Sequence, residues 1–193
     1  MRYGKGSVFG LVVMASWLCA MSLSAAETEP SPLPAWSRAP SVGFNLNEVA
    51  SDFGCGLTLT SPFVRNGRLA ARASVNMAWH PGVNTWREGW FPYSSYRLGL
   101  VAVGGRVGGF VRLYGEGGGL YLRTNAHLSD HDHWGAYGHF GFEFLLTQTK
   151  RPKMSYFAEL GAVGIGARAE KLSSQPLYSN GFSISTGLRV YLK

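Results

Sequence analysis

Apolar and polar side chains alternate along most of the chain after residue 40. Between Val42 and Leu46 the even positions are apolar, and the odd positions hold glycine and asparagine. A period of two places the two kinds of side chain on opposite faces of a β-strand. In the segment 154–167, Val163 and Ile165 share the parity of the polar Glu159, an irregularity that a β-bulge would explain. The alternation predicts strands at about residues 41–50, 52–63, 68–80, 93–104, 108–122, 136–148, 154–167 and 180–192.

The two faces of these strands predict a barrel. Strands of about 9–11 residues, when tilted, match the hydrocarbon thickness of a bilayer, and only closure removes edges that lipid cannot hydrate. We predict an all-β fold, an eight-stranded antiparallel up-and-down transmembrane β-barrel. The set expected to face outward is Val42, Phe44, Leu46, Phe53, Cys55, Leu57, Leu59, Leu69, Ala71, Ala73, Val75, Met77, Trp79, Tyr96, Leu98, Leu100, Ala102, Phe140, Phe142, Phe144 and Leu146. The opposite parity holds Asn45, Asn47, Thr58, Thr60, Arg72, Ser74, Asn76, Arg97, His139 and Glu143.

The connections between the predicted strands alternate in length. Tight, basic turns are expected at 65–68, 104–107 and 150–153, whereas 81–92, 123–135 and 168–179 are expected to be long loops. Bacterial barrels have short periplasmic turns and long external loops. The first hairpin, at Ala50 and Ser51, is short although it falls on the loop side. This order places both ends of the barrel domain on the periplasmic side.

The first 40 residues are expected to lie outside the barrel. Arg2 and Lys5 precede an apolar run from Val8 to Ala20, and small residues lead to Ala26, which predicts a secretory signal peptide over residues 1–26. Residues 27–40 contain four prolines and no apolar period, so we expect an extended or disordered periplasmic leader. The barrel domain is then residues 41–193.

Composition supports an envelope protein. Cys19 lies in the predicted signal, so Cys55 is the one cysteine left and an intramolecular disulfide is excluded. The net charge is +7, and removal of Arg2 and Lys5 with the signal lowers it by two, to +5. Behind a signal peptide, this charge indicates attraction to anionic lipid headgroups and no nucleic-acid partner. The 26 glycines and 26 aromatic residues suit close-packed strands and interfacial girdles.

The last predicted strand carries a short motif. Residues 185–192 have the form polar, x, Gly, x, x, apolar, x, apolar, with Gly187, Val190 and Leu192 at the defining positions. This resembles the C-terminal assembly signal of bacterial outer-membrane barrels, although Lys193 follows where such strands usually end on an aromatic residue. With the eight strands and the alternating loops, residues 41–192 resemble the small outer-membrane barrels of the OmpA/OmpX type.

The resemblance identifies the superfamily and no particular member. It implies a monomeric barrel in the outer membrane of a Gram-negative bacterium, inserted by the barrel-assembly machinery and surrounded by outer-membrane lipid and lipopolysaccharide. It also implies a lumen packed by side chains, and we expect no cofactor.

Charged side chains fall on the inward parity. Charges at membrane depth are costly unless paired, and an eight-stranded barrel is just wide enough for its interior side chains to fill it. We predict a salt-bridged plug, with a gated ion path as the alternative. The predicted network is Arg72, Arg97, Arg112, Glu116, Glu143 and Glu159.

The loop at 123–135 concentrates potential ligands. His127, His131 and His133 alternate with two aspartates, a set that could bind Zn²⁺ or Cu²⁺ if the segment curled. Structural metal sites usually take ligands from two separated pairs, so we predict no metal site and keep these histidines as candidates.

The same loop contains a possible nucleophile. His127 and Ser129 match the His-x-Ser spacing that is found in the lipid A deacylase barrels, with Asp130 or Glu143 as the acid. In those enzymes the pair lies on a strand near the C-terminus and faces lipid, whereas here it lies in a predicted loop. We predict no catalytic activity and keep the pair as weak candidates.

Aromatic residues gather near the predicted strand ends. Indole and phenol rings favour the headgroup level of a membrane, so these residues are expected to anchor the barrel in the interface, although a binding platform would use the same rings. The set is Trp79, Trp86, Trp90 and Tyr137, with Tyr156 and Tyr178 read in the same way.

The sequence therefore favours a non-catalytic outer-membrane barrel, a structural or surface-interaction protein whose exposed loops bind envelope lipid or an external partner. Three alternatives stay open: a lipid A-modifying hydrolase using His127 and Ser129, a narrow channel, and a soluble lipocalin-like barrel. In the last of these the apolar face would point inward around a ligand.

Overall fold

The computed structural model describes residues 33–83, 88–146 and 153–192. The predicted signal peptide at 1–26, the first part of the leader at 27–32, and Trp86 lie outside the described residues.

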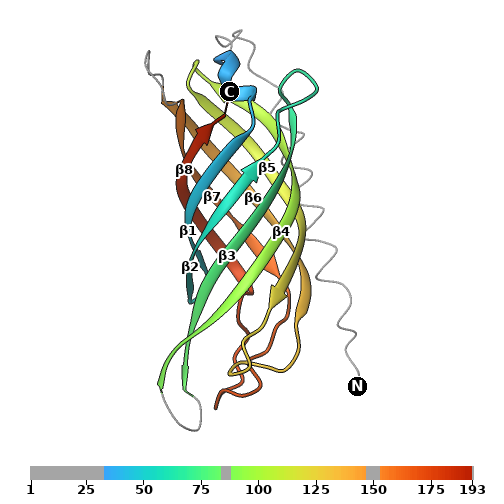
Figure 1. Ribbon diagram of the computed structural model, residues 1–193, viewed down its shortest axis with the longest axis vertical. Helices are drawn as coiled ribbons and strands as arrows, with labels where there is room; N and C mark the ends of the chain where they lie inside the picture. The colour runs from blue at the N-terminus through green and yellow to red at the C-terminus, as the bar shows by residue number, and fades with distance from the viewer. Residues whose placement is uncertain (1–32, 84–87, 147–152, 193) are drawn as a thin grey trace, which may run out of the picture.

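The strands of the described chain form a single closed sheet in which each strand pairs with its neighbours in sequence and β8 pairs back with β1 (Figure 1). The elements are the 3-10 helix η1 (Ala35–Arg38) and the strands β1 (Ser41–Val49), β2 (Asp52–Thr60), β3 (Leu69–Val83), β4 (Glu88–Val107), β5 (Val111–Arg123), β6 (His133–Leu146), β7 (Met154–Gly164) and β8 (Gly181–Tyr191). Strand β1 pairs with β8 along its whole length, from Ser41 opposite Tyr191 to Val49 opposite Ser183. Neither strand has a free edge, and the predicted eight-stranded antiparallel up-and-down barrel is confirmed.

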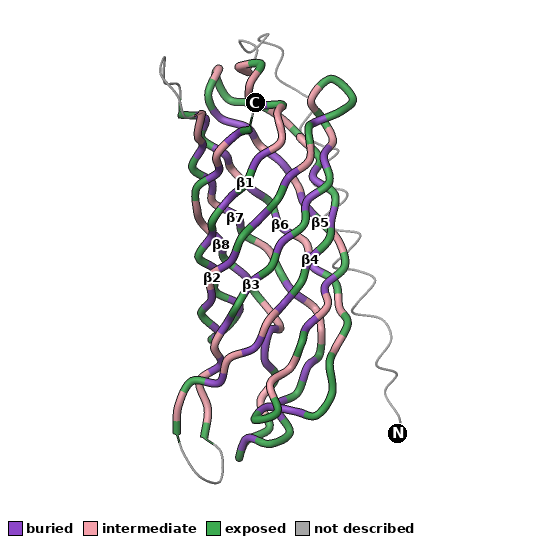
Figure 2. The backbone as a smooth tube through the Cα atoms, in the orientation of Figure 1, coloured by how far each residue is buried: buried purple, intermediate pink, exposed green. Residues whose placement is uncertain are grey.

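Side chains alternate between the outer wall and the lumen, as the sequence pattern predicts (Figure 2). On β4, Leu98 keeps 68% of its surface exposed on the outer wall, while the neighbouring Arg97 is buried inside. The predicted outward set is exposed or half-buried, and the predicted inward set is buried. The sequence specifies the strand register, because shifting the pairing by one residue would move the apolar side chains from the outer wall to the lumen.

The barrel has two different ends (Figure 1). We call one the turn end: it carries the short connections 61–68 and 108–110, helix η1 and the end of β8. The other, the loop end, carries the longer connections 124–132 and 165–180 and the tight β1–β2 hairpin. No helix in the described part of the chain has the length and apolar character that a membrane span requires.

The expected long loop at 81–92 is wrong. Strands β3 and β4 continue pairing out to Val83 opposite Glu88, so residues 81–83 and 88–92 extend the two strands. Pro81 lies opposite Trp90 and Pro92 opposite Trp79, so the ladder tolerates two residues that usually signal a loop.

The expected bulge in the seventh strand is also wrong. Strand β7 pairs regularly with both neighbours, and the register shift lies instead in β4, between Val103 and Gly105. Val163 keeps its inward direction because the lumen contains an apolar layer, in which it packs with Val49 and Leu120.

The described part of the leader is ordered against the barrel, so an extended or disordered form is wrong for residues 35–38. The Phe63 N–H donates to the Arg38 carbonyl oxygen at 2.9 Å, and the Leu192 N–H donates to that of Pro40 at 2.8 Å. The Trp36 ring packs edge-on against Tyr191, with ring centroids 5.0 Å apart. Helix η1 is therefore fixed across the turn end.

Candidate functional site

The charged interior of the barrel is the most distinctive arrangement of the described chain. All six members of the predicted network lie in the lumen and are buried, and a seventh charged residue, Arg189, lies among them. Arg189 is not a member of the predicted network, although it shares the inward parity of β8 with Ser183 and Ser185, which could have indicated it.

Glu159 on β7 is the centre of one group. Its Oε1 accepts hydrogen bonds from Arg72 Nη1 at 2.9 Å, from Arg189 Nη2 at 2.8 Å and from the Tyr114 hydroxyl at 2.5 Å. These donors come from β3, β8 and β5. One carboxylate therefore joins four strands across the lumen.

Glu143 on β6 is the centre of a second group, nearer the turn end. It accepts from Arg112 Nη1 at 3.1 Å and from the Ser155 hydroxyl at 2.5 Å, and the Tyr191 hydroxyl also donates to it. Arg189 Nη1 lies 3.3 Å from the same carboxylate. Because Arg189 contacts both glutamates, the two groups form one network.

Glu116 on β5 completes the network through its contacts with Arg72 and Tyr137. Arg72 Nη1 pairs with Glu116, and the Tyr137 hydroxyl donates to Oε1 of Glu116 at 2.7 Å. Placing Tyr137 at the membrane interface was therefore wrong: it is 6% exposed and points into the lumen, because the carboxylate offers its hydroxyl a partner. Tyr178 is likewise buried, in the core beneath the loops.

Aromatic rings cover the faces of the buried guanidinium groups. The Arg189 guanidinium carbon lies 3.9 Å from the centre of the Phe157 ring, and that of Arg112 lies 4.3 Å from the centre of Phe63. Such stacking stabilises a cation that is removed from water. The Arg97 guanidinium carbon lies 5.4 Å from the centre of the Tyr137 ring. Unlike the other arginines of the lumen, Arg97 has no ion-pair partner among the described residues.

Packed side chains cover both ends of the lumen. At the turn end, Arg112 Nη2 donates to the carbonyl oxygen of the buried Ser37 in η1 at 2.5 Å. At the loop end, the connections 124–132 and 165–180 fold over the opening and enclose a small apolar core. That core contains Ala78, Phe91, Tyr93, Leu122, Leu128, Ala167, Ala169, Leu172 and Tyr178.

A polar cluster that is not among the predicted site residues adjoins this apolar core through Tyr93. Asp52 Oδ1 lies 2.5 Å from His80 Nδ1, and Asp52 Oδ2 accepts from the Tyr93 hydroxyl and the Ser179 N–H, both at 2.7 Å. The Ser179 bond fastens the 165–180 connection to the barrel. Asp52 and His80 have the inward parity of their strands, which could have indicated them.

The histidines of the 124–132 connection do not converge. His127 and His131 are exposed, and His133 begins β6. Within the residues that the structure describes, no three histidine, cysteine or acidic side chains lie close enough together to hold a metal ion.

The candidate nucleophile Ser129 and the candidate base His127 contact different residues. Ser129 is buried and its hydroxyl accepts from the His131 N–H at 3.3 Å, whereas the His127 ring packs near Phe91. Of the two candidate acids, Asp130 pairs with Lys171, and Glu143 lies in the lumen network. The geometry assembles no triad from these residues.

The Asp132 carboxylate stabilises the conformation of the 124–132 connection. Asp132 accepts from the Tyr121 hydroxyl and, at 2.8 Å, from the Thr124 N–H. These two hydrogen bonds favour the ionised form and hold the pKa of Asp132 below its usual value.

The other predicted residues lie on the outer wall. Trp79 and Trp90 line an apolar hollow with Phe53 near the loop end, and Tyr156 is exposed nearer the turn end. Leu192, from the C-terminal motif, is exposed outward, and Val190 is half-buried. Gly187 lies where β8 closes against β1, opposite Asn45.

No protein-family model and no curated protein sequence matches the chain. Among solved structures, it is similar to the N-terminal β-barrel domain of Pseudomonas aeruginosa OprF, with a TM-score of 0.49 and 10% sequence identity. The alignment covers 80% of this chain and 98% of that domain. The assignment of the barrel therefore depends on the strand pairing of this chain alone.

Proposed function

We propose that this chain is a non-catalytic barrel of the bacterial outer membrane, which acts as a structural or surface-interaction protein. The observation that carries the proposal is the radial separation of the side chains, with an apolar outer wall around a lumen of mutually neutralising charges.

The outer wall favours lipid as its surroundings. Large apolar side chains such as Leu57, Val75 and Leu98 are exposed on the neighbouring strands β2, β3 and β4. A continuous apolar surface of this kind would promote aggregation in water, whereas hydrocarbon accommodates it at little cost. A soluble lipocalin-like barrel would need the opposite orientation, with the apolar face around an internal ligand.

The lumen favours a structural role over conduction. Arg72, Arg189 and Glu159 are held together at the centre, and both ends are covered by packed side chains. A continuous path for ions would require many of these contacts to break together. The narrow channel is therefore the weaker candidate.

The loop end is the part of the molecule that an external partner would meet. Its connections are held by specific contacts, including Ser179 to Asp52 and Thr124 to Asp132. Ordered loops on a rigid barrel form a surface that can bind envelope lipid or another molecule without a large ordering cost. The absence of a triad around Ser129 supports binding over hydrolysis.

Two measurements test the proposal. The full chain expressed in a Gram-negative host should fractionate with the outer membrane and require detergent for release. Its folded form should also migrate differently from the heated form in a detergent gel, as closed barrels do. Release by osmotic shock without detergent would contradict the membrane location, and loss of acyl chains from lipopolysaccharide on incubation would contradict the non-catalytic role.

A further inference from the structure

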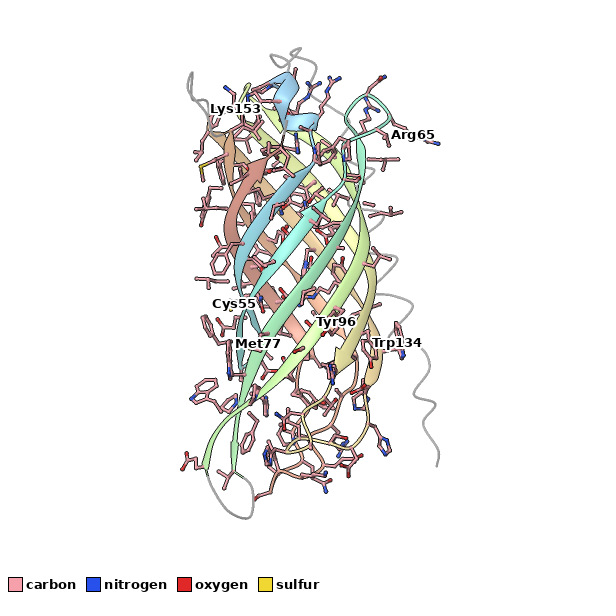
Figure 3. All side chains as sticks on the ribbon, viewed as in Figure 1. Cys55, Arg65, Met77, Tyr96, Trp134 and Lys153 are labelled. Carbon is pink, nitrogen blue, oxygen red and sulfur yellow. The ribbon has the colours of Figure 1, made fainter. Side chains whose placement is uncertain are left out.

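Basic side chains gather at the turn end of the barrel. Arg65, Arg68 and Arg106 are exposed there, and Arg38 of η1 lies beside the first turn. Lys153 directly precedes β7, and Figure 3 shows it at the same end of the barrel as Arg65. Among the described residues, the acidic side chains lie in the lumen or toward the loop end. Within that part of the chain, this end presents basic side chains and no exposed acidic side chain, and we call these five residues the basic rim.

Exposed apolar side chains alternate with the basic rim. Val64 precedes Arg65 and is 59% exposed, while Val107 follows Arg106 and Phe110 is 53% exposed in the same connection. A surface that carries apolar and cationic groups together suits the boundary between acyl chains and headgroups. A soluble acidic partner would not require the apolar members.

Backbone hydrogen bonds fix the turn at 64–68 in the absence of a ligand. Arg65, Asn66 and Gly67 have φ values of 50°, 60° and 83°, and the Arg68 N–H donates to the Val64 carbonyl oxygen at 3.0 Å. The Arg68 carbonyl oxygen in turn accepts from the Val103 N–H of β4 at 2.8 Å. The backbone of the rim is thus held by hydrogen bonds, which reduces the entropy lost on binding.

We propose that the basic rim binds the phosphate groups of anionic phospholipids in the leaflet at the turn end, an inference that rests on the proposed membrane location. Guanidinium groups suit this ligand because they offer paired N–H donors to phosphate oxygens and keep their charge at all physiological pH values. Continuity with the apolar wall brings these donors to the headgroup level, and the exposed Val64 and Phe110 would lie against the upper acyl chains.

The test compares two charge-matched variants of the full chain. Arg65→Gln/Arg106→Gln removes two members of the rim, and Arg123→Gln/Arg168→Gln removes two exposed arginines toward the loop end. Each protein is first inserted into phosphatidylcholine vesicles and checked by heat-dependent gel mobility. It is then extracted, mixed with equal amounts of phosphatidylglycerol and phosphatidylcholine, and the lipids that stay bound are counted by native mass spectrometry at low salt.

We expect the original chain and the loop-end variant to retain phosphatidylglycerol preferentially, and the rim variant to lose about fivefold in preference for each charge removed. Equal retention of the two lipids by the original chain, or equal losses in both variants, would overturn the proposal while leaving the membrane location intact. Failure of the original chain to insert would overturn both. Stronger binding of the rim to soluble peptidoglycan fragments than to phosphatidylglycerol would assign it to the cell wall instead.

Discussion

Arg189 Nη2 donates to Oε1 of Glu159 at 2.8 Å, which joins the last strand of the barrel to the strand before it. The same guanidinium reaches Glu143, so Arg189 is the cation on which both halves of the lumen network depend.

Replacement of Arg189 should be among the most damaging single changes in the lumen. Arg189→Met leaves two buried carboxylates short of a cation, and removal of one partner from a buried ion pair costs about 3–5 kcal/mol. The free energy of unfolding, measured by urea titration in lipid vesicles, should fall by about that amount. Arg97→Met is the control, because Arg97 forms no ion pair with a carboxylate in the part of the chain that the structure describes, and it should cost clearly less. Equal losses in the two variants would argue against the network.

The effects of replacing Arg112 and Glu143 on the free energy of unfolding should be strongly coupled. Arg112→Met removes one of the two cations that contact Glu143, and Glu143→Leu leaves Arg112 without its carboxylate partner, whereas the double variant removes both charges of the pair. We expect the double variant to lose less stability than the sum of the two single variants, with a coupling energy of about 1–3 kcal/mol. Strict additivity in the same urea titrations would show that the two groups do not stabilise each other.

Asp52 should control access to the 165–180 connection. Asp52→Asn weakens the acceptor for Ser179 N–H and the Tyr93 hydroxyl, a loss of about 1–3 kcal/mol for buried hydrogen bonds. Tryptic cleavage of the folded protein after Arg168 and Lys171 should then accelerate about tenfold. Glu48→Gln, which removes an exposed carboxylate of β1, should leave the cleavage rate unchanged.

Gly187 should be required for closure between β8 and β1. A Cβ at this position would meet the Phe44 carbonyl oxygen and lie 2.9 Å from the Asn45 Cα, and backbone atoms cannot move aside cheaply. Gly187→Ala should therefore cost about 1–3 kcal/mol and reduce the fraction with folded gel mobility. Gly115→Ala is the matched control, because a Cβ there meets nothing within 4 Å. Normal folding of the Gly187 variant would show that β8 and β1 can separate enough to accommodate a methyl group.

The barrel itself was predictable because one periodic signal determines it. Strand positions, the direction of side chains such as Leu98 and Arg97, and the pairing of neighbours all follow from a period of two combined with the need to remove edges. The ends were less predictable. Local propensity marks Pro81 and Pro92 as loop residues, yet the β3–β4 hairpin continues through them, with Trp90 and Trp79 as their cross-strand partners.

The sequence predicted most of the residues that form the lumen network, but not which of them contact one another. Parity identified Arg72 and Glu159 as inward, yet no sequence signal says which cation meets which carboxylate across a lumen. Tyr137 was misplaced because an aromatic ring near a strand end suits the interface and the lumen equally until its hydroxyl partner is known. The Asp52–His80 pair was overlooked because its members are separated in sequence and join only through the register of β2 and β3.

The orientation of the apolar face is the central claim, and spin-label accessibility tests it most directly. In a Cys55→Ala background, cysteine labels at Leu57 and Leu98 would be compared with a label at Glu170 in the 165–180 connection, all in reconstituted vesicles. Our prediction is that collisions with oxygen relax the first two labels, which are shielded from a water-soluble nickel reagent, while nickel relaxes the Glu170 label. Nickel access at Leu57 and Leu98 equal to that at Glu170 would contradict it.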